Sequence, residues 1–178
     1  MKYLARRARS PDAGGWTALP PMADHSIRLR RLLAERASLT AALQRHGNTT
    51  VSVLRQRLAR PDADELRLMR IRPHQLRMVR EVVLRVDGVP WVFAHTVANA
   101  PGQALMRRAG RRPLATVLFA DPKVRARTLH YRHIDRRHPL FNAAAIWSPR
   151  SALRFVARRA VFERGAARLL VTEVFLLP

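Results

Sequence analysis

Two charged residues of opposite sign stand where a folded chain normally buries apolar side chains. Residues 76–86 alternate as a β-strand does, and Arg80 shares its predicted face with five apolar residues: Leu76, Met78, Val82, Leu84 and Val86. The alternation over 168–177 places Glu173 in the same situation, among Leu169, Val171, Phe175 and Leu177. An unpaired charge in such surroundings is strongly destabilising, so each residue needs a partner of opposite charge.

The partner of Arg80 decides what chemistry this strand can do. A guanidinium binds a carboxylate through two parallel hydrogen bonds, so the missing anion is either a protein carboxylate or an anionic ligand. Arg80 and Glu173 could satisfy each other as a buried salt bridge with no catalytic role. Both interpretations are compatible with the sequence alone.

A β-hairpin is predicted to position Arg80. Asp87-Gly88 joins two β-rich runs, and this dipeptide is the strongest short-range signal for a two-residue hairpin turn. If Val86 and Val89 flank the turn, Leu84 opposes Trp91, Val82 opposes Phe93 and Arg80 opposes His95. This register would place His95, which cannot neutralise an arginine, beside Arg80.

The other predicted elements are short and give an α+β fold. We expect helices at 25–36, at 39–46 with Ser38 as N-cap and Gly47 as stop, and at 103–109, with a helix also favoured for 122–131. We expect strands at 48–58, 158–164 and 168–177, the last two joined at Gly165-Ala166, with a polar turn at 61–65 and a loop at 132–149. Strands joined by hairpins indicate an antiparallel sheet with helices packed on it.

Length and composition predict one domain. The chain has 178 residues, 48% of them hydrophobic, which suits a single core over residues 25–178 behind a Pro- and Gly-rich, loosely ordered segment, 1–24. There is no apolar run long enough to span a membrane and no apolar segment typical of a signal peptide. The absence of cysteine excludes disulfides and thiolate chemistry, and a cytoplasmic monomer is expected.

The net charge of +22 raises the question of nucleic acid. The basicity is arginine spread along the chain, with Lys2 and Lys123 as the only lysines, and no nucleic-acid-binding motif accompanies it. We expect attraction of small anions and no specific nucleic acid; the charge also allows weak adhesion to anionic membranes. His130, His133, Asp135 and His138 lie in an Arg-rich, Pro-terminated stretch that favours an exposed loop over a metal site.

Several runs together resemble the bacterial chorismate lyase family. They are 79–82 (Val-Arg-Glu-Val), 87–97 (Asp-Gly-Val-Pro-Trp-Val-Phe-Ala-His-Thr-Val), 112–119 (Arg-Pro-Leu-Ala-Thr-Val-Leu-Phe), 157–162 (Ala-Arg-Arg-Ala-Val-Phe) and 169–176 (Leu-Leu-Val-Thr-Glu-Val-Phe-Leu), preceded by the helix at Ser38-Leu-Thr. Each motif alone is weak, but they follow the family's order from about residue 32 to residue 177.

The resemblance implies an activity and a site. Family members convert chorismate to 4-hydroxybenzoate and pyruvate for ubiquinone synthesis without a cofactor, in a pocket buried under helix-turn-helix lids that also retain the product. By position, the family's carboxylate-binding arginine corresponds to Arg80, its hydroxyl-contacting carboxylate to Glu173, and its lid or backbone contacts to Leu39 and Leu114. Many members carry a second arginine where this chain has His95, which would help hold the enolpyruvyl group.

A competing interpretation keeps the pocket and loses the chemistry. The chorismate lyase fold resembles the effector-sensing domain of one family of bacterial transcription regulators. Such a domain would bind a small aromatic acid without converting it. Residues 1–24 are too few for a winged-helix DNA-binding domain, which favours the enzyme.

Overall fold

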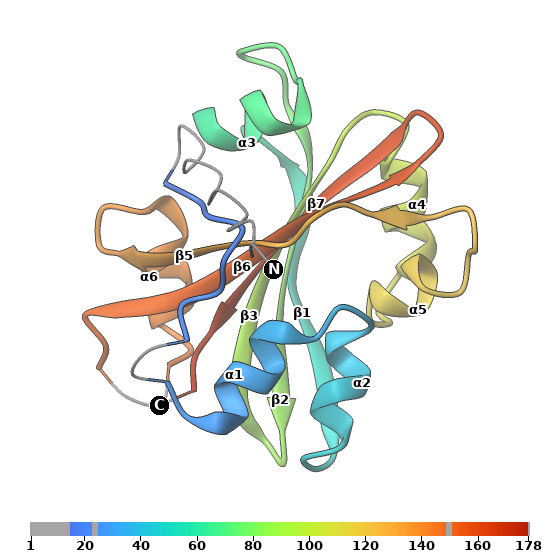
Figure 1. Cartoon of the computed structure of the whole chain (residues 1–178). Helices are drawn as coiled ribbons and strands as arrows, with labels where there is room; N and C mark the ends of the chain where they lie inside the picture. Colours follow the sequence, from blue (N-terminus) through green and yellow to red (C-terminus); the bar gives the residue numbers. More distant parts are fainter. Residues whose placement is uncertain (1–14, 23–24, 149–150, 178) are drawn as a thin grey trace, which may run out of the picture.

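The computed structural model describes residues 15–22, 25–148 and 151–177, and its strands form one antiparallel sheet (Figure 1). The strands are β1 (Thr49–Ala59), β2 (Arg77–Val86), β3 (Val89–Ala98), β4 (Arg125–Ala126), β5 (His130–Asp135), β6 (Arg154–Arg164) and β7 (Ala167–Phe175). Their order is β1-β2-β3-β7-β6-β4, and β5 also pairs with β6. The predicted α+β class is confirmed.

Six short helices accompany the sheet in the described part of the chain. They are α1 (Ile27–Ala34), α2 (Leu39–Gln44), α3 (Ala63–Met69), α4 (Gln103–Ala109), α5 (Ala115–Leu118) and α6 (Pro139–Ala145). Ser38 caps α2 as predicted, because its side chain accepts a hydrogen bond from the Ala41 N–H. No helix in these residues is long and apolar enough to cross a bilayer.

The helices divide between the two faces of the sheet. Buried apolar side chains of α1 and α2 pack with Leu84 and Phe175, and those of α4 and α5 pack with Ala98 and Leu169. On the other face, α3 and α6 belong to separate clusters with residues such as Val79 and Val83. Figure 1 shows α1 and α2 at the bottom and α4 and α5 at the right, so that two helix pairs border one region of the sheet.

The hairpin turn is confirmed, but the predicted register is wrong. Asp87 and Gly88 both have positive φ, 48° and 80°, as a two-residue turn of type I′ requires. An irregularity follows on β3: Arg85 pairs with Pro90 while Leu84 pairs with Val92, which leaves Trp91 as an extra residue. Beyond this bulge every β3 side chain is shifted by one position, so Arg80 opposes Thr96, and His95 opposes Glu81 on the opposite face.

Three local predictions are also wrong. The expected turn at 61–65 begins α3, where Asp62 and Glu65 form a reciprocal capping box. The favoured helix at 122–131 and the expected loop at 132–149 contain β4, β5 and α6 instead. Both short strands exist by pairing with β6, a long-range contact that local propensity does not reveal.

Part of the segment expected to be loosely ordered is packed on the sheet. Residues 1–14 and 23–24 lie outside the described residues. Trp16 is buried, and Thr17 exchanges two backbone hydrogen bonds with Tyr131, of 2.9 and 2.7 Å. The described part of the N-terminal segment therefore belongs to the same folded unit.

Candidate functional site

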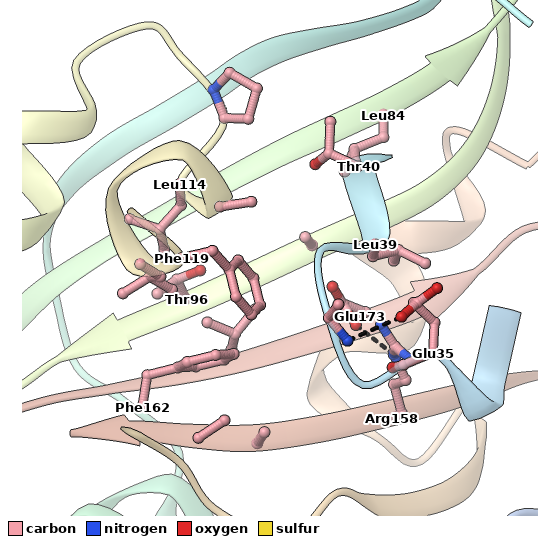
Figure 2. A pocket seen from close by; sticks show the side chains of 18 of the residues that line it. Glu35, Leu39, Thr40, Leu84, Thr96, Leu114, Phe119, Arg158, Phe162 and Glu173 are labelled. Carbon is pink, nitrogen blue, oxygen red and sulfur yellow. Dashed lines mark hydrogen bonds and ion pairs between the residues drawn. The ribbon is translucent and has the colours of Figure 1, made fainter. Parts of the chain in front are cut away.

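A cavity of about 280 Å³ lies between the sheet and the segments that contain α2 and α5 (Figure 2). Four residues singled out in the sequence line it: Leu39 at the start of α2, Arg80 on β2, Leu114 directly before α5, and Glu173 on β7. In Figure 2, Leu114 and Phe119 lie on one side of the cavity, and Leu39 and Glu173 on the other. The fold thus brings together four residues that are far apart in the sequence.

The sheet register explains why Arg80 and Glu173 face the same space. Arg80 pairs with Thr96, and two residues along β3 Ala94 pairs with Glu173. The two positions are therefore two strands and two residues apart, about 10 Å across the strands and about 7 Å along them. Side chains from these positions can reach opposite ends of one small ligand.

Arg80 is a buried cation without an acidic partner in the described residues. It is 2% exposed, and burial lowers its pKa. Its Nη1 donates to Gln56 Oε1 (2.9 Å) and to the carbonyl oxygen of Gly110 (2.5 Å), and its Nη2 donates to the carbonyl oxygen of Arg112 (2.8 Å). Three of its five N–H groups are used in this way, and the buried Nε has no hydrogen-bond partner among these residues. Nε and Nη2 share one edge of the guanidinium, which suits a carboxylate.

Glu173 is paired, but not with Arg80. Its Oε2 accepts a hydrogen bond of 2.5 Å from Nε of Arg158, which opposes it on β6. The alternative of an Arg80–Glu173 salt bridge is therefore wrong. The Glu173 side chain keeps 19% of its surface exposed, so the carboxylate remains accessible from the cavity.

Arg158 was missed by the sequence reasoning, although a signal was present. Arg158 and Arg159 are consecutive on β6, and consecutive strand residues point to opposite faces, so one of them must face the cavity side. Arg158 lines the cavity and is 3% exposed; Arg159 pairs with Asp64 on the other face.

His95 does not line the cavity, which corrects the expectation that it lies beside Arg80. Its ring is buried between two carboxylates, with Nε2 3.1 Å from Glu65 Oε1 and Nδ1 3.0 Å from Glu81 Oε1. Burial alone would lower the pKa of His95, but the contacts with the two carboxylates outweigh it and raise this pKa to about 9. The imidazolium is thus part of a charged cluster in the other face of the sheet.

The cluster is close to electroneutral. Arg55 donates to Glu81 through Nε (2.6 Å) and Nη2 (2.8 Å), so two cations meet two carboxylates. Burial raises the pKa of Glu81, but His95 and Arg55 outweigh it and lower this pKa to about 2. The pKa of Glu65 is also lowered, because its interaction with His95 outweighs burial. These residues stabilise the β2–β3 pairing behind the cavity.

The cavity can hold a small aromatic acid. Apart from the charged groups, its walls are largely apolar, with Val82, Leu84, Val171 and Phe162 among the lining side chains. The buried guanidinium of Arg80 and the carboxylate of Glu173, separated by apolar walls, are a typical arrangement for a specific small-molecule site. Among the described residues, no group of three or more His, Asp or Glu side chains is arranged to hold a metal ion.

Solved structures share the fold at low sequence identity. The effector domain of PhnF from Mycobacterium smegmatis superposes with a TM-score of 0.59 at 14% identity, covering 78% of this chain and 88% of that chain. The C-terminal domain of the histidine utilization repressor from Pseudomonas syringae pv. tomato gives 0.54 at 10% identity, covering 72% and 91%. At these identities the similarity establishes the fold alone.

Sequence comparisons identify the family. A "Probable chorismate pyruvate-lyase" from Aromatoleum aromaticum is 40% identical over 175 residues, covering 93% of this chain and 94% of that protein. A protein of the same name from Ralstonia nicotianae is 39% identical over 177 residues, covering 94% and 89%. The family model described as chorismate lyase matches residues 12–178. The chain therefore belongs to the chorismate lyase family.

Proposed function

We propose that this protein is a chorismate pyruvate-lyase, which converts chorismate to 4-hydroxybenzoate and pyruvate. The observation that carries the proposal is the buried guanidinium of Arg80, without an acidic partner in the described residues, in the wall of a cavity that also contains Glu173. Chorismate supplies what these groups lack: a ring carboxylate at one end and a hydroxyl group at the other. Family membership supports the same substrate.

The reaction is an elimination that balances without a cofactor. The ether bond between the ring and the enolpyruvyl oxygen breaks, and the ring carbon that bears the hydroxyl loses its proton. The enolpyruvate takes up one proton and becomes pyruvate, and the ring becomes aromatic. Aromatisation supplies the driving force, so the protein's task is to orient the substrate and stabilise developing charge.

Each site residue has a role in this scheme. Arg80 binds the ring carboxylate through its Nε and Nη2 edge, where Nε has no hydrogen-bond partner among the described residues. Glu173 contacts the hydroxyl at the other end and is placed to assist proton transfer. Leu39 and Leu114 pack against the ring from the two helical covers, and the apolar walls exclude water.

Product release is expected to be slow. The cavity lies under the segments that contain α2 and α5, and 4-hydroxybenzoate retains both groups that Arg80 and Glu173 would bind. We expect movement of a cover to accompany release, and such steps often limit turnover. We propose product inhibition by 4-hydroxybenzoate and a place at the start of ubiquinone ring synthesis.

The direct test is to incubate the purified protein with chorismate and to follow pyruvate and 4-hydroxybenzoate together. Equal amounts of the two products are expected. If the protein binds 4-hydroxybenzoate and forms neither product from chorismate, it is a binding domain and the lyase proposal fails.

Glu173→Gln is expected to lower the rate of pyruvate formation about 100-fold, the lower range for loss of a group that assists proton transfer. Glutamine keeps the size and a hydrogen-bonding oxygen but loses the negative charge. Single-turnover measurements with chorismate check this result. The matched control is Asp121→Asn, because Asp121 pairs with Arg164 and neither residue lines the cavity; its rate should equal that of wild type. Equal rates for the two variants would remove Glu173 from the chemistry.

A further inference from the structure

One buried arginine, Arg158, joins the cavity's first cover to the carboxylate of Glu173. We call residues 32–40, which comprise the end of α1, the loop and the start of α2, the cover segment. Nη1 of Arg158 donates to three of its carbonyl oxygens: Leu32 at 2.8 Å, Leu33 at 3.2 Å and Glu35 at 2.5 Å. Nε of the same guanidinium donates to Glu173 at 2.5 Å, and Figure 2 shows Arg158 between Glu173 and Glu35.

The guanidinium is rigid, so these contacts are linked. Nε and Nη1 belong to one planar group whose donors have a fixed geometry. The guanidinium carbon also lies 5.7 Å from the centroid of the Phe175 ring, within the range of a cation–π contact. A movement of the cover segment that breaks the carbonyl contacts therefore changes the position of the donor to Glu173.

The cover segment forms part of the cavity wall. Glu35, Arg36, Ala37, Leu39 and Thr40 all line the cavity. The Glu35 carboxylate accepts hydrogen bonds from the Ala37 N–H (2.9 Å) and from Arg45 (3.0 Å), which keeps the segment internally ordered. The contacts with Arg158 add to the burial of Leu32, Leu33 and Leu39 in holding the segment against the sheet.

We propose that Arg158 is a positioning residue for the lyase reaction: it orients Glu173 and holds the cover segment closed, so that closure and orientation of the carboxylate are coupled. The proposal rests on the proposed function for its catalytic part. The coupling between the cover segment and Glu173 does not require turnover and can be measured separately.

Tyr131 provides a matched control. Its hydroxyl donates to the carbonyl oxygen of Leu33 at 3.2 Å, so it holds the same segment as Arg158. Tyr131 does not line the cavity, and its hydroxyl makes no hydrogen bond to Glu173 in the described residues. Tyr131→Phe therefore weakens the cover segment without changing the donor to the carboxylate.

The test compares Arg158→Lys, Tyr131→Phe and wild type. A lysine ammonium cannot reach Glu173 and three carbonyl oxygens together. Arg158→Lys should therefore release bound 4-hydroxybenzoate about 50-fold faster, because several charged hydrogen bonds are lost. It should also slow single-turnover pyruvate formation about tenfold, because Glu173 loses its fixed donor. Tyr131→Phe should speed release less than about fivefold, the effect of one neutral hydrogen bond, and leave the single-turnover rate unchanged.

Hydrogen exchange gives a readout that is independent of catalysis. The backbone amides of the cover segment in the ligand-free protein should exchange about tenfold faster in Arg158→Lys than in wild type. A folded Arg158→Lys protein with wild-type exchange and wild-type release would overturn the proposal. If wild type did not convert chorismate, the exchange result would still decide whether Arg158 holds the segment.

A second variant covers the case in which Arg158→Lys does not fold. Coupling acts in both directions, so Glu173→Gln should make the cover-segment amides exchange about threefold faster. Unchanged exchange in this variant would show that the carboxylate and the segment are independent, and the coupling would be wrong.

Discussion

Arg80→Ala is expected to weaken binding of 4-hydroxybenzoate about 100-fold or more. Removing one partner of a desolvated, hydrogen-bonded charge pair costs about 2–5 kcal/mol. In this cavity the loss falls on the ligand's carboxylate, because no described acid pairs with Arg80. Equilibrium binding by calorimetry or fluorescence measures the effect. Arg85→Ala is the matched control: it lies on the same strand, donates to Ser52 and does not line the cavity, so affinity should be unchanged.

A ligand variant separates recognition from folding. Methyl 4-hydroxybenzoate lacks the negative charge, so wild type should bind it about 100-fold more weakly than the acid, whereas Arg80→Ala should bind acid and ester alike. Arg80 also holds the loop at Gly110 and Arg112, so thermal melting must show that the variant is folded. A folded variant that still prefers the acid over the ester would place the carboxylate elsewhere.

His95→Leu is expected to lower the free energy of unfolding by about 3–5 kcal/mol, because it leaves Glu65 and Glu81 buried with one cation fewer. Chemical denaturation at pH 6 measures this change. The control is His130→Leu, a partly exposed histidine on β5 whose Nδ1 lies 3.1 Å from the carbonyl oxygen of Thr128. A His95→Leu protein as stable as this control would contradict the charged cluster.

The same cluster predicts how stability varies with pH. The pKa of His95 is raised from 6.5 to about 9 in the folded protein. Its contribution to the free energy of unfolding is therefore complete below pH 6.5 and is lost as pH rises to about 9. At 1.36 kcal/mol per unit this amounts to roughly 3 kcal/mol. The pKa of Glu81 is lowered from 4.5 to about 2, so its contribution is complete above pH 4.5 and is lost as pH falls toward 2.

Denaturation curves from pH 6 to pH 9.5 check the alkaline limb. Wild type should lose stability across this range, and His95→Leu should show a much flatter profile. A wild-type profile that is flat from pH 6.5 to pH 9 would mean that His95 is neutral in the folded protein.

Arg80 and Glu173 could be identified from the sequence because their burial depends only on the period-two pattern of their own strands. That pattern assigns faces within a strand without knowledge of the neighbouring strand. His95 could not be placed in the same way. Its face relative to Arg80 depends on the β2–β3 register, and one extra residue at Trp91 reverses it.

The remaining differences have a common cause in long-range contacts. β4 and β5 are strands only because they pair with β6. The local sequence around Glu65 predicts a turn, because its contacts with Asp62 and His95 do not show in the sequence. Arg158 belongs to the same class, because its acceptors are the carbonyl oxygens of a segment more than 120 residues away in the chain. Such partners are visible only in the folded structure.

A crystal structure of the protein with 4-hydroxybenzoate tests the central claim most directly. We expect the carboxylate on the Nε and Nη2 edge of Arg80, the phenolic oxygen within hydrogen-bonding distance of Glu173, and the ring between Leu39 and Leu114. A ligand bound outside this cavity, or bound with its carboxylate away from Arg80, would contradict the account.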